Sequence, residues 1–383
     1  MKSTKTLALS LKDLQHSKNY MLHNKKIALG MSGGVDSSLS AHLLVEQGYD
    51  VTGIYLECWR APGCRTDEDR ADALKVALSL NIPFQVLDFK NTYRDSVVQA
   101  FFDDYKAGKT PNPDIACNKE IKFGLFYDWA MKNDFDAIAT GHYTKITDGQ
   151  LVIPADRHKD QTYFLYQIND NQLKHVIFPL ENMTKTEVRK EAEKRSLHVK
   201  DKKDSVGICF IGDIDVHSFL KDELGENPGP VVDLSGNTIG KHNGLWFYTI
   251  GQRHGFEIDK RTLITTENGE IERQNFPPFY VIAKKQKENQ LVVGFGTETE
   301  QSQFSIRDIH WISRNQPGDL NNLLVRIRHT GELLPSVLQK NNVKLDEPIR
   351  GIAPGQSAVF YQKQGEETVC LGGAIIDEVV FDS

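Results

Sequence analysis

The first half of the chain alternates short apolar runs with segments whose apolar residues recur at helical spacing. The runs that have the length and composition of buried strands are residues 27–29, 51–56, 83–89 and 137–142. Between them, apolar side chains recur every three or four positions, at Leu39, Leu43 and Leu44, at Leu74, Ala77 and Leu78, and at Val97, Val98, Phe101, Phe102 and Tyr105. This alternation predicts an α/β fold with a doubly wound parallel sheet, covered by helices on both faces.

The pattern changes after a charged run at residues 200–204, which we expect to be a solvated linker. Before this run, Thr184 and Glu187 have the spacing of a capping box that opens a helix. Beyond it Gly and Pro become frequent, and from Phe279 the chain consists almost entirely of strand-like runs separated by turn signals, the first of which is a turn at Glu288 and Asn289 between two such runs. Such spacing is typical of a β-barrel or a sandwich.

These changes predict four segments. They are an unstructured N-terminal extension at residues 1–24, an α/β domain at 25–205, a small β-rich α+β domain at 206–278 and a C-terminal β-barrel at 279–383. A length of 383 residues suits two or three domains. No apolar run approaches the roughly 20 residues of a membrane span, and the extension lacks the features of a signal peptide.

Composition and charge narrow the class of protein. The net charge of −6 disfavours a general nucleic-acid coat, but it leaves room for a local basic surface. An odd number of cysteines in a long chain disfavours a secreted disulfide scaffold and indicates a reducing, cytoplasmic location. The five cysteines are Cys58, Cys64, Cys117, Cys209 and Cys370.

The sequence SGGVDS at residues 32–37 lies between the first predicted strand and the first predicted helix. Gly33 and Gly34 allow positive φ and a close approach of backbone N–H groups to an anion, and the following helix presents its positive N-terminus to the same place. An ordinary strand–helix turn needs one glycine and a cap. The loop therefore predicts a phosphate site, in which Asp36 binds Mg²⁺ or orients the loop.

Two further segments carry cysteines. Pro111 and Pro113 stiffen the chain before Cys117, and Asp114 is placed to cap a helix whose first turn would contain that thiol and lower its pKa. Cys117 is then either a reactive thiol or a small buried hydrophobe. Cys209 lies in an apolar tetrad between Gly207 and Gly212, which is read either as a buried strand or as a mobile segment for a thiol that must move.

Seven motifs now occur in a fixed order: GMSGGVDSS, TPNPDIACNKEIKFG, ATGHY, DQTYFL, GICFIG, YTIGQRHG and APGQSAVFY. Together they resemble the tRNA-specific 2-thiouridylase family of the N-type ATP pyrophosphatases, from about residue 25 to the C-terminus. Members of this family make 2-thiouridine at the wobble position of tRNA. The chain departs from the family at Leu56, Val206 and His329, which are usually Met, Gln or Thr, and Tyr.

The resemblance implies an adenylation reaction that uses ATP with Mg²⁺. The 2-oxo group of the wobble uridine attacks the α-phosphate, pyrophosphate leaves, and a sulfur nucleophile then displaces AMP from C2. Asp36 is the candidate Mg²⁺ ligand, and we expect no other side chain to bind metal. The residues implied in ATP binding are Gly30, Met31, Ser32, Gly33, Gly34, Val35, Asp36, Ser37, Leu56 and Gly141.

The resemblance also assigns the two thiols. Cys209 carries the incoming sulfur as a persulfide received from a sulfur-relay protein. Cys117 either attacks this persulfide to release sulfide or binds C2 of the base covalently. The two cysteines end as a disulfide, which must be reduced before the next turnover.

The remaining implied contacts concern tRNA. Asn112, Pro113 and Asp114 face the target base, where Asp114 acts as acid or base or is a plain N-cap. We expect a monomer that does not bind membranes. The tRNA-contact positions that match the family pattern are Lys159, Asp160, Gln161, Arg328 and His329.

Two other classes of function share the phosphate loop. An ATP-dependent ligase that forms amides or amines needs neither the cysteine pair nor domains that bind tRNA. A nucleotide sensor would bind ATP without chemistry. Cys117 and Cys209, each in its own motif, favour the thiolation hypothesis over the ligase, and release of pyrophosphate only in the presence of tRNA would separate all three classes.

Overall fold

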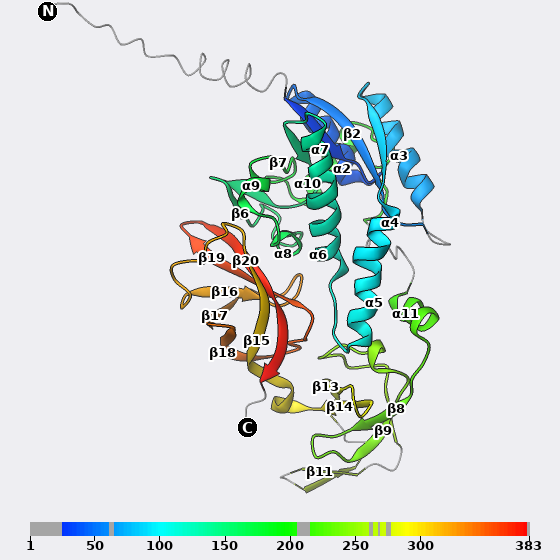
Figure 1. The fold of residues 1–383 in the computed structure, drawn as a ribbon, viewed down its shortest axis with the longest axis vertical. Helices are drawn as coiled ribbons and strands as arrows, with labels where there is room; N and C mark the ends of the chain where they lie inside the picture. The colour runs from blue at the N-terminus through cyan, green and yellow to red at the C-terminus, as the bar shows by residue number, and fades with distance from the viewer. Residues whose placement is uncertain are drawn as a thin grey trace, which may run out of the picture.

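The computed structural model describes residues 25–60, 65–204, 215–259, 263–266, 269–272 and 277–380. Figure 1 shows an elongated molecule with the α/β domain at one end, the red and orange C-terminal strands in the middle and the green central domain at the other end. The chain therefore runs the full length of the molecule before the strands from β15 (Glu300–Trp311) onward return to the middle.

The parallel sheet has the strand order β3–β2–β1–β4–β7, and every neighbouring pair is parallel. The predicted doubly wound sheet is thus confirmed, and its core includes the fully buried Ile27, Leu29 and Ile54. The strands are β1 (Lys26–Gly30), β2 (Asp50–Glu57), β3 (Phe84–Asp88), β4 (Ala137–Ala139) and β7 (Val176–Ile177).

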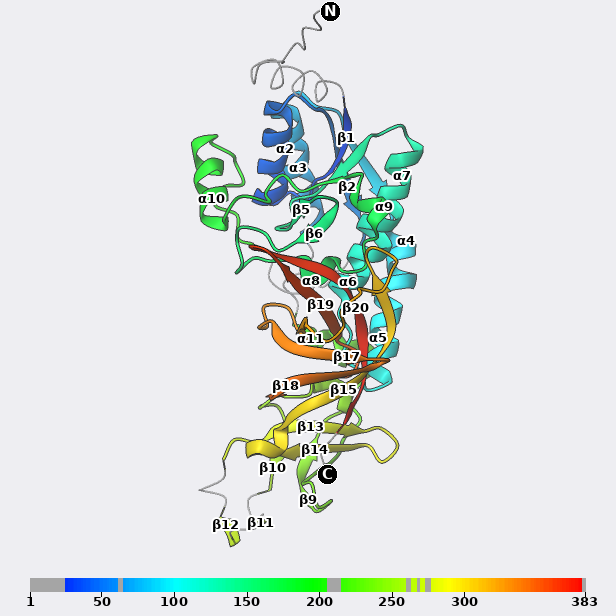
Figure 2. The same cartoon turned by 90° about the vertical axis from the view of Figure 1, so that its left-hand side faces the viewer.

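Helices cover both faces of this sheet. Figure 2 shows α2 (Val35–Glu46) and α3 (Thr66–Ser79) on one side of β1 and β2, and α7 (Phe126–Lys132) on the other. The apolar face predicted for α3 is wrong in detail, because Leu74 and Leu78 are 39% and 69% exposed. The helix instead packs through smaller side chains, Ala73, Val76 and Ala77.

Two long helices combine α-helical and π-helical turns. One runs through α4 (Lys90–Tyr93), the π-helix η1 (Arg94–Val98) and α5 (Gln99–Lys106). The other runs through α6 (Pro113–Cys117), the π-helix η2 (Asn118–Leu125) and α7. Their facing side chains form one core, which contains Tyr93, Val97, Phe101, Cys117 and Ile121. π-Helical turns are rare in proteins overall, and those that occur are often found at functional sites.

The α/β domain is completed by short elements and one capped helix. Thr184 and Glu187 form the predicted capping box at the start of α10 (Lys185–Lys194). The short helices are α8 (Thr162–Leu165) and α9 (Asp170–Leu173).

The central domain is built on a sheet with the order β10–β9–β8–β14–β13, preceded by α11 (Val216–Leu224). The strands β13 (Tyr280–Lys285) and β14 (Gln290–Gly294) form a hairpin around Asn289, as predicted, but β14 pairs with β8 (Gly229–Val232). Residues 280–294 therefore belong to the central sheet, and the boundary expected at 278/279 lies too early. The other elements are β9 (Thr238–His242), η3 (Leu245–Phe247), β10 (Glu257–Ile258), β11 (Leu263–Thr266) and β12 (Gly269–Glu272).

The C-terminal strands close into a barrel in the order β15–β18–β17–β16–β19–β20, with β20 returning to pair with β15. The predicted barrel is thus confirmed. Two strands of the first domain extend the same sheet, because β6 (Gln150–Val152) pairs with β20 and β5 (Lys145–Thr147) pairs with β6. The barrel strands are β15 (Glu300–Trp311), β16 (Leu323–Arg326), β17 (Leu334–Gln339), β18 (Asn342–Arg350), β19 (Ser357–Gln364) and β20 (Glu367–Val380).

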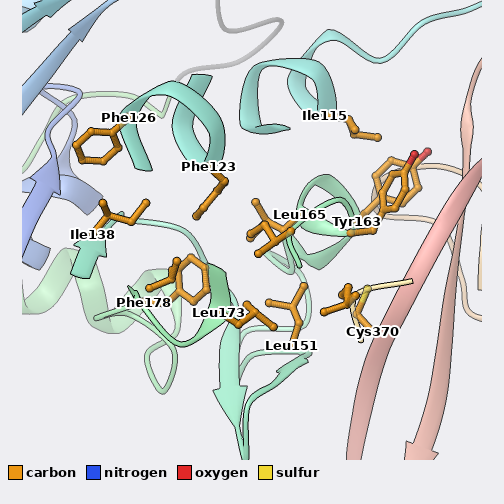
Figure 3. Close-up of a cluster of buried hydrophobic side chains, with 14 of the residues drawn as sticks. Ile115, Phe123, Phe126, Ile138, Leu151, Tyr163, Leu165, Leu173, Phe178 and Cys370 are labelled. Carbon is orange, nitrogen blue, oxygen red and sulfur yellow. The ribbon is translucent and has the colours of Figure 1, made fainter. Parts of the chain in front are cut away.

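One apolar core joins the first domain to the barrel. Figure 3 shows Leu151, Tyr163 and Leu165 beside Cys370 of β20, in a cluster that continues to Phe126 and Ile138 of the parallel sheet region. A buried ion pair lies at the same interface, where Arg326 Nη1 donates to Asp160 Oδ2 at 2.6 Å. The side chain of Arg326 points into this interface, and its guanidinium lies over the ring of Tyr361.

Removal of one charge from this ion pair tests how firmly the barrel is attached. In Arg326→Met the carboxylate of Asp160 stays buried without its partner, so the free energy of unfolding should fall by about 3–5 kcal/mol. Arg314→Met removes the exposed pair with Asp170 and should cost less than about 1 kcal/mol. Urea unfolding curves of the two variants measure the difference, and equal losses would contradict the assignment.

Candidate active site

The loop between β1 and α2 needs glycine at one position. Gly33 has a φ of +74°, and a Cβ there would lie 2.9 Å from Asp69 Cα and closer still to the Asp69 carbonyl. Gly34 has an ordinary φ of −89°, and its Cβ would meet only Ser32 Oγ at 3.4 Å. The expectation of positive φ therefore holds for Gly33 and is wrong for Gly34.

The hydroxyl groups of the loop fix its shape. Ser37 Oγ accepts a hydrogen bond from Ser32 N at 3.2 Å, and Ser38 Oγ donates to Gly34 O at 2.8 Å. Gly141, at the end of β4, approaches so closely that a Cβ would lie 2.9 Å from Ser37 N. The first N–H groups of α2 have no intrahelical acceptor, so the start of this helix and the glycine-containing loop before it suit an anion.

Asp36 is held by protein donors. Lys185 Nζ donates to both of its carboxylate oxygens, at 2.7 and 2.8 Å, and Tyr143 Oη donates to Oδ1 at 2.7 Å. A carboxylate engaged by an ammonium group does not fit as a ligand of Mg²⁺, because the two cations would compete for the same oxygens. The geometry favours the second role considered for Asp36, which is to orient the loop.

A network of ion pairs surrounds the loop, centred on Asp204. Burial opposes ionisation of Asp204, yet hydrogen bonds from Lys159 and Lys185 hold the pKa of its carboxyl well below the ordinary value. Arg189 adds a third pair at 2.6 Å. Lys185 therefore bridges Asp36 of the loop and Asp204, at 2.8 Å from the latter.

The charged run at residues 200–204 is therefore not the solvated linker that we expected. Lys202 Nζ donates to Gly33 O at 2.9 Å and also pairs with Asp69 and Asp72. Sequence reasoning missed Lys185, Lys202 and Asp204. One usable signal was the capping box, because it placed Lys185 in the first turn of a helix.

Cys117 lies at the end of α6, where it is 4% exposed. The helix is capped by Asn112, whose side chain accepts from Ile115 N at 3.3 Å, and Pro113 occupies the first turn. The prediction of Asp114 as the cap is wrong by two residues, because Asn112 precedes a proline that starts a helix well. Cys117 consequently lies two residues deeper in the helix than predicted, immediately before the π-turns.

Leu56 connects the nucleotide loop with the thiol. It lies at the carboxyl end of β2 and packs against both apolar clusters, one with Ile115 and Phe123, the other with Cys117. In parallel α/β sheets, ligands bind at the carboxyl ends of the strands. The predicted adenosine contact and the predicted nucleophile thus lie at the same edge of the sheet.

His142 is a second residue that sequence reasoning did not single out. Burial holds the pKa of its imidazole well below the ordinary value, and the Lys122 ammonium lowers it further. Lys122 Nζ lies 3.4 Å from Nε2, and Thr140 Oγ1 lies 2.7 Å from Nδ1. Because a lysine has no acceptor, Nε2 accepts and Nδ1–H donates to Thr140. A neutral His142 therefore orients Lys122, five residues after Cys117.

The three adjacent residues expected to contact tRNA all have partners within the protein. Lys159 pairs with Asp204, Asp160 is 3% exposed and pairs with Arg326, and Gln161 Oε1 accepts from Tyr143 N at 2.8 Å. These side chains are engaged in contacts within the protein, and the contacts of the three residues with tRNA remain predictions.

The two candidates on the barrel are more accessible. Arg328 is exposed. The ring of His329 packs on Phe164 with centroids 4.2 Å apart, and its buried Nδ1 has no hydrogen-bond partner within the described part of the chain. Both positions are compatible with a bound nucleotide.

The second thiol, Cys209, lies outside the described residues, as does Cys64. Cys370 is buried in the core that joins the first domain to the barrel, which raises the pKa of its thiol, and burial does the same for Cys58. Among the residues that the structure describes, no group of three or more His, Cys, Asp or Glu side chains is arranged to hold a metal ion. In the same residues, no helix is both long and apolar enough to cross a membrane.

Comparison with curated proteins identifies the family. The tRNA-specific 2-thiouridylase MnmA of Shewanella sp. (strain MR-4) is 41% identical over 374 residues, which cover 93% of this chain and 97% of that protein. The chain belongs to the tRNA-specific 2-thiouridylase family. The enzyme of the same name from Staphylococcus aureus (strain bovine RF122 / ET3-1) is also 41% identical, over 92% of this chain and 95% of the relative.

Family models cover the three parts of the fold. Residues 25–213 match the tRNA methyl transferase HUP domain, residues 217–295 the tRNA methyl transferase PRC-barrel domain, and residues 301–376 the aminomethyltransferase beta-barrel domain. The second match includes β13 and β14, in agreement with the pairing of β14 with β8. The first includes the loop between β1 and α2.

A single methyl group tests the loop. In Gly33→Ala the left-handed conformation costs about 1–2 kcal/mol, before the overlap with Asp69 is counted, so ATP affinity should fall by at least about tenfold. Gly34→Ala is the matched control, because its backbone and surroundings accept a Cβ. Isothermal titration with ATP measures both affinities. Equal effects of the two substitutions would show that the shape of the loop at Gly33 is unimportant for binding.

Proposed function

We propose that this protein is an ATP-dependent tRNA-uridine 2-sulfurtransferase that converts the wobble uridine to 2-thiouridine. The observation that carries the proposal is the position of Leu56 at the carboxyl edge of the parallel sheet, between the phosphate loop and the core that holds Cys117. One crevice can therefore present an adenylated base to a thiol. Full-length similarity to 2-thiouridylases supports the same activity.

The adenylation step uses the loop and its cation. The N-terminus of α2 and the backbone of residues 30–37 bind the phosphates of ATP, with Gly141 and the Leu56 backbone next to the adenosine. Lys185 exchanges one of its carboxylate partners for the departing pyrophosphate, which places a positive charge where negative charge accumulates. Mg²⁺ accompanies ATP, and its ligands are phosphate oxygens and water, because Asp36 is engaged by Lys185.

The sulfur-transfer step uses the segment that leads into α6. Asn112, Pro113 and Asp114 face the flipped uridine, since a base that reacts at C2 must leave the stack. Asp114 exchanges a proton with the base, and Cys117 is the thiol that completes transfer from a persulfide on Cys209. Adenylation makes the C2 oxygen a good leaving group, so AMP departs when sulfur attacks.

The proposal includes its partners. Wobble-uridine tRNA contacts Lys159, Asp160 and Gln161 on the first domain, which requires their internal pairs to open, and Arg328 and His329 on the barrel. A sulfur-relay protein loads the persulfide on Cys209. The enzyme acts as a monomer in the cytoplasm.

Nucleoside mass spectrometry of tRNA incubated with the protein, ATP and a persulfide donor tests the reaction. Wild-type protein should form 2-thiouridine, whereas Cys117→Ser and Cys209→Ser should form less than about 1% as much, because a serine hydroxyl neither carries nor accepts sulfane sulfur. Cys58→Ala and Cys370→Ala serve as controls and should retain turnover. Normal product from Cys117→Ser would overturn the two-thiol mechanism.

The salt dependence of tRNA binding tests Arg328. If its guanidinium neutralises one phosphate, the slope of log K against log[salt] should become less steep by about 1 in Arg328→Ala. Arg314→Ala, on an exposed turn that already pairs with Asp170, is the control and should leave the slope unchanged. Filter binding at several salt concentrations provides both slopes, and an unchanged slope in Arg328→Ala would exclude the phosphate contact.

A further inference from the structure

Two sequence motifs, residues 248–255 (YTIGQRHG) and 353–361 (APGQSAVFY), contain no residue to which the proposed reaction assigns a role. In the structure Gly355 of the second motif lies against residues 109–110, which lead into the segment that faces the proposed target base, and Gly251 of the first motif lies against Gly351. The meeting point is the connection between β18 and β19, residues 351–356, which we call the junction loop.

The junction loop satisfies both backbone polar groups of Thr110. Thr110 N donates to Pro354 O at 2.9 Å, and Gln356 Nε2 donates to Thr110 O at 2.8 Å. Thr110 is buried. The loop thus forms hydrogen bonds with both the N–H and the C=O of Thr110, as a neighbouring strand would, although neither segment is part of a sheet there.

Glycine makes this approach possible. Gly355 has a φ of +91°, and a Cβ would lie 2.7 Å from Lys109 Cβ and 2.8 Å from Thr110 N. Real Cβ atoms do not approach so closely, so any side chain at position 355 must displace residues 109–110.

The central domain reaches the same place. A Cβ on Gly251 would lie 2.9 Å from Gly351 Cα, and both glycines have positive φ, +86° and +88°. The side chain of Gln286, in the turn between β13 and β14, fills the space next to Gly108. Residues 108–110 of the first domain are therefore held between the central domain and the barrel.

A displacement of Thr110 is transmitted to the reacting groups. Pro111 and Pro113 restrict the backbone that follows, and Asn112 both faces the proposed target base and caps the helix that carries Cys117. We propose that the junction loop is a positioning device for this segment, with Gly355 and Gln356 as its positioning residues. The inference rests on the proposed function for the chemistry that is positioned, but not for the contacts themselves.

A pair of glycine substitutions separates positioning from stability. Gly355→Ala introduces both a strained φ and the overlap with Lys109 and Thr110. Gly365→Ala is the matched control, because Gly365 has a φ of +62° in the turn between β19 and β20 but its Cβ would meet nothing within 4 Å. Single-turnover thiolation should slow by about 10- to 100-fold in Gly355→Ala, since shifts near 1 Å cost that much, and by less than about twofold in Gly365→Ala.

The affinities for ATP and tRNA should change much less than the rate of thiolation. Gly355→Ala should bind ATP and tRNA within about threefold of wild type, because neither binding site changes its composition. Gln356→Glu keeps the size of the side chain but loses the amide donor to Thr110 O, and it should slow thiolation as well, whereas Gln364→Glu on the exposed end of β19 should not. Equal rates in Gly355→Ala and Gly365→Ala would overturn the proposal.

A readout that needs no tRNA keeps this test apart from the proposed function. Alkylation of Cys117 by iodoacetamide, followed by peptide mass spectrometry, reports how well its helix start is held. It should be about tenfold faster in Gly355→Ala than in Gly365→Ala, because local opening exposes a thiol that is otherwise buried. Identical alkylation rates would sink the inference even if thiolation is observed. A protein that makes no 2-thiouridine but shows the expected difference would contradict only the proposed function.

Discussion

The buried ion pair between Asp160 and Arg326 fixes the position of the α/β domain, which contains the proposed ATP site, relative to the C-terminal barrel, which contains proposed tRNA contacts. A carboxylate and a guanidinium that are removed from water need each other, because either one alone is strongly unfavourable in the interior. Asp160 also accepts hydrogen bonds from the backbone and hydroxyl of Thr162, so its position is determined from both domains. The barrel and the α/β domain therefore act as one body, and neither can shift without breaking a buried charge pair.

Short contacts lead from this pair to the phosphate loop. Gln161, next to Asp160, exchanges two hydrogen bonds with the backbone of Tyr143, and the hydroxyl of Tyr143 holds Asp36. Residues that the family pattern associates with tRNA thus contact residues that shape the nucleotide site. This geometry suits an enzyme in which ATP should react only when RNA is bound, because opening of one contact changes the acceptors available to the next.

The sequence predicted features that depend on local patterns. Strand runs such as residues 51–56, the capping box at Thr184 and the hairpin at Asn289 were correct, because periodicity, capping and turn chemistry are encoded within a few residues. Features with distant partners were missed. Lys202 looked like part of a solvated run, since the aspartates that bind it lie about 130 residues away in the chain.

The same limit explains the errors at the site. The cap is an exception, because Asn112 is favoured over Asp114 by a local feature, the proline that follows it and starts the helix. The π-turns after Cys117 depend on packing against another helix and have no simple sequence signature. Residues 280–294 were assigned to the barrel because strand runs do not reveal their partners.

The pairing of β6 with β20 has a consequence for synthesis. The strand at residues 150–152 emerges from the ribosome more than 200 residues before its partner at Val369 and Cys370. Until then its edge and the apolar side chains around Leu151 stay uncovered, which exposes a nascent chain to aggregation. The last strand completes the barrel and the first domain together, so a chain cut short before residue 367 should be recognised by cellular quality control as incomplete in both domains.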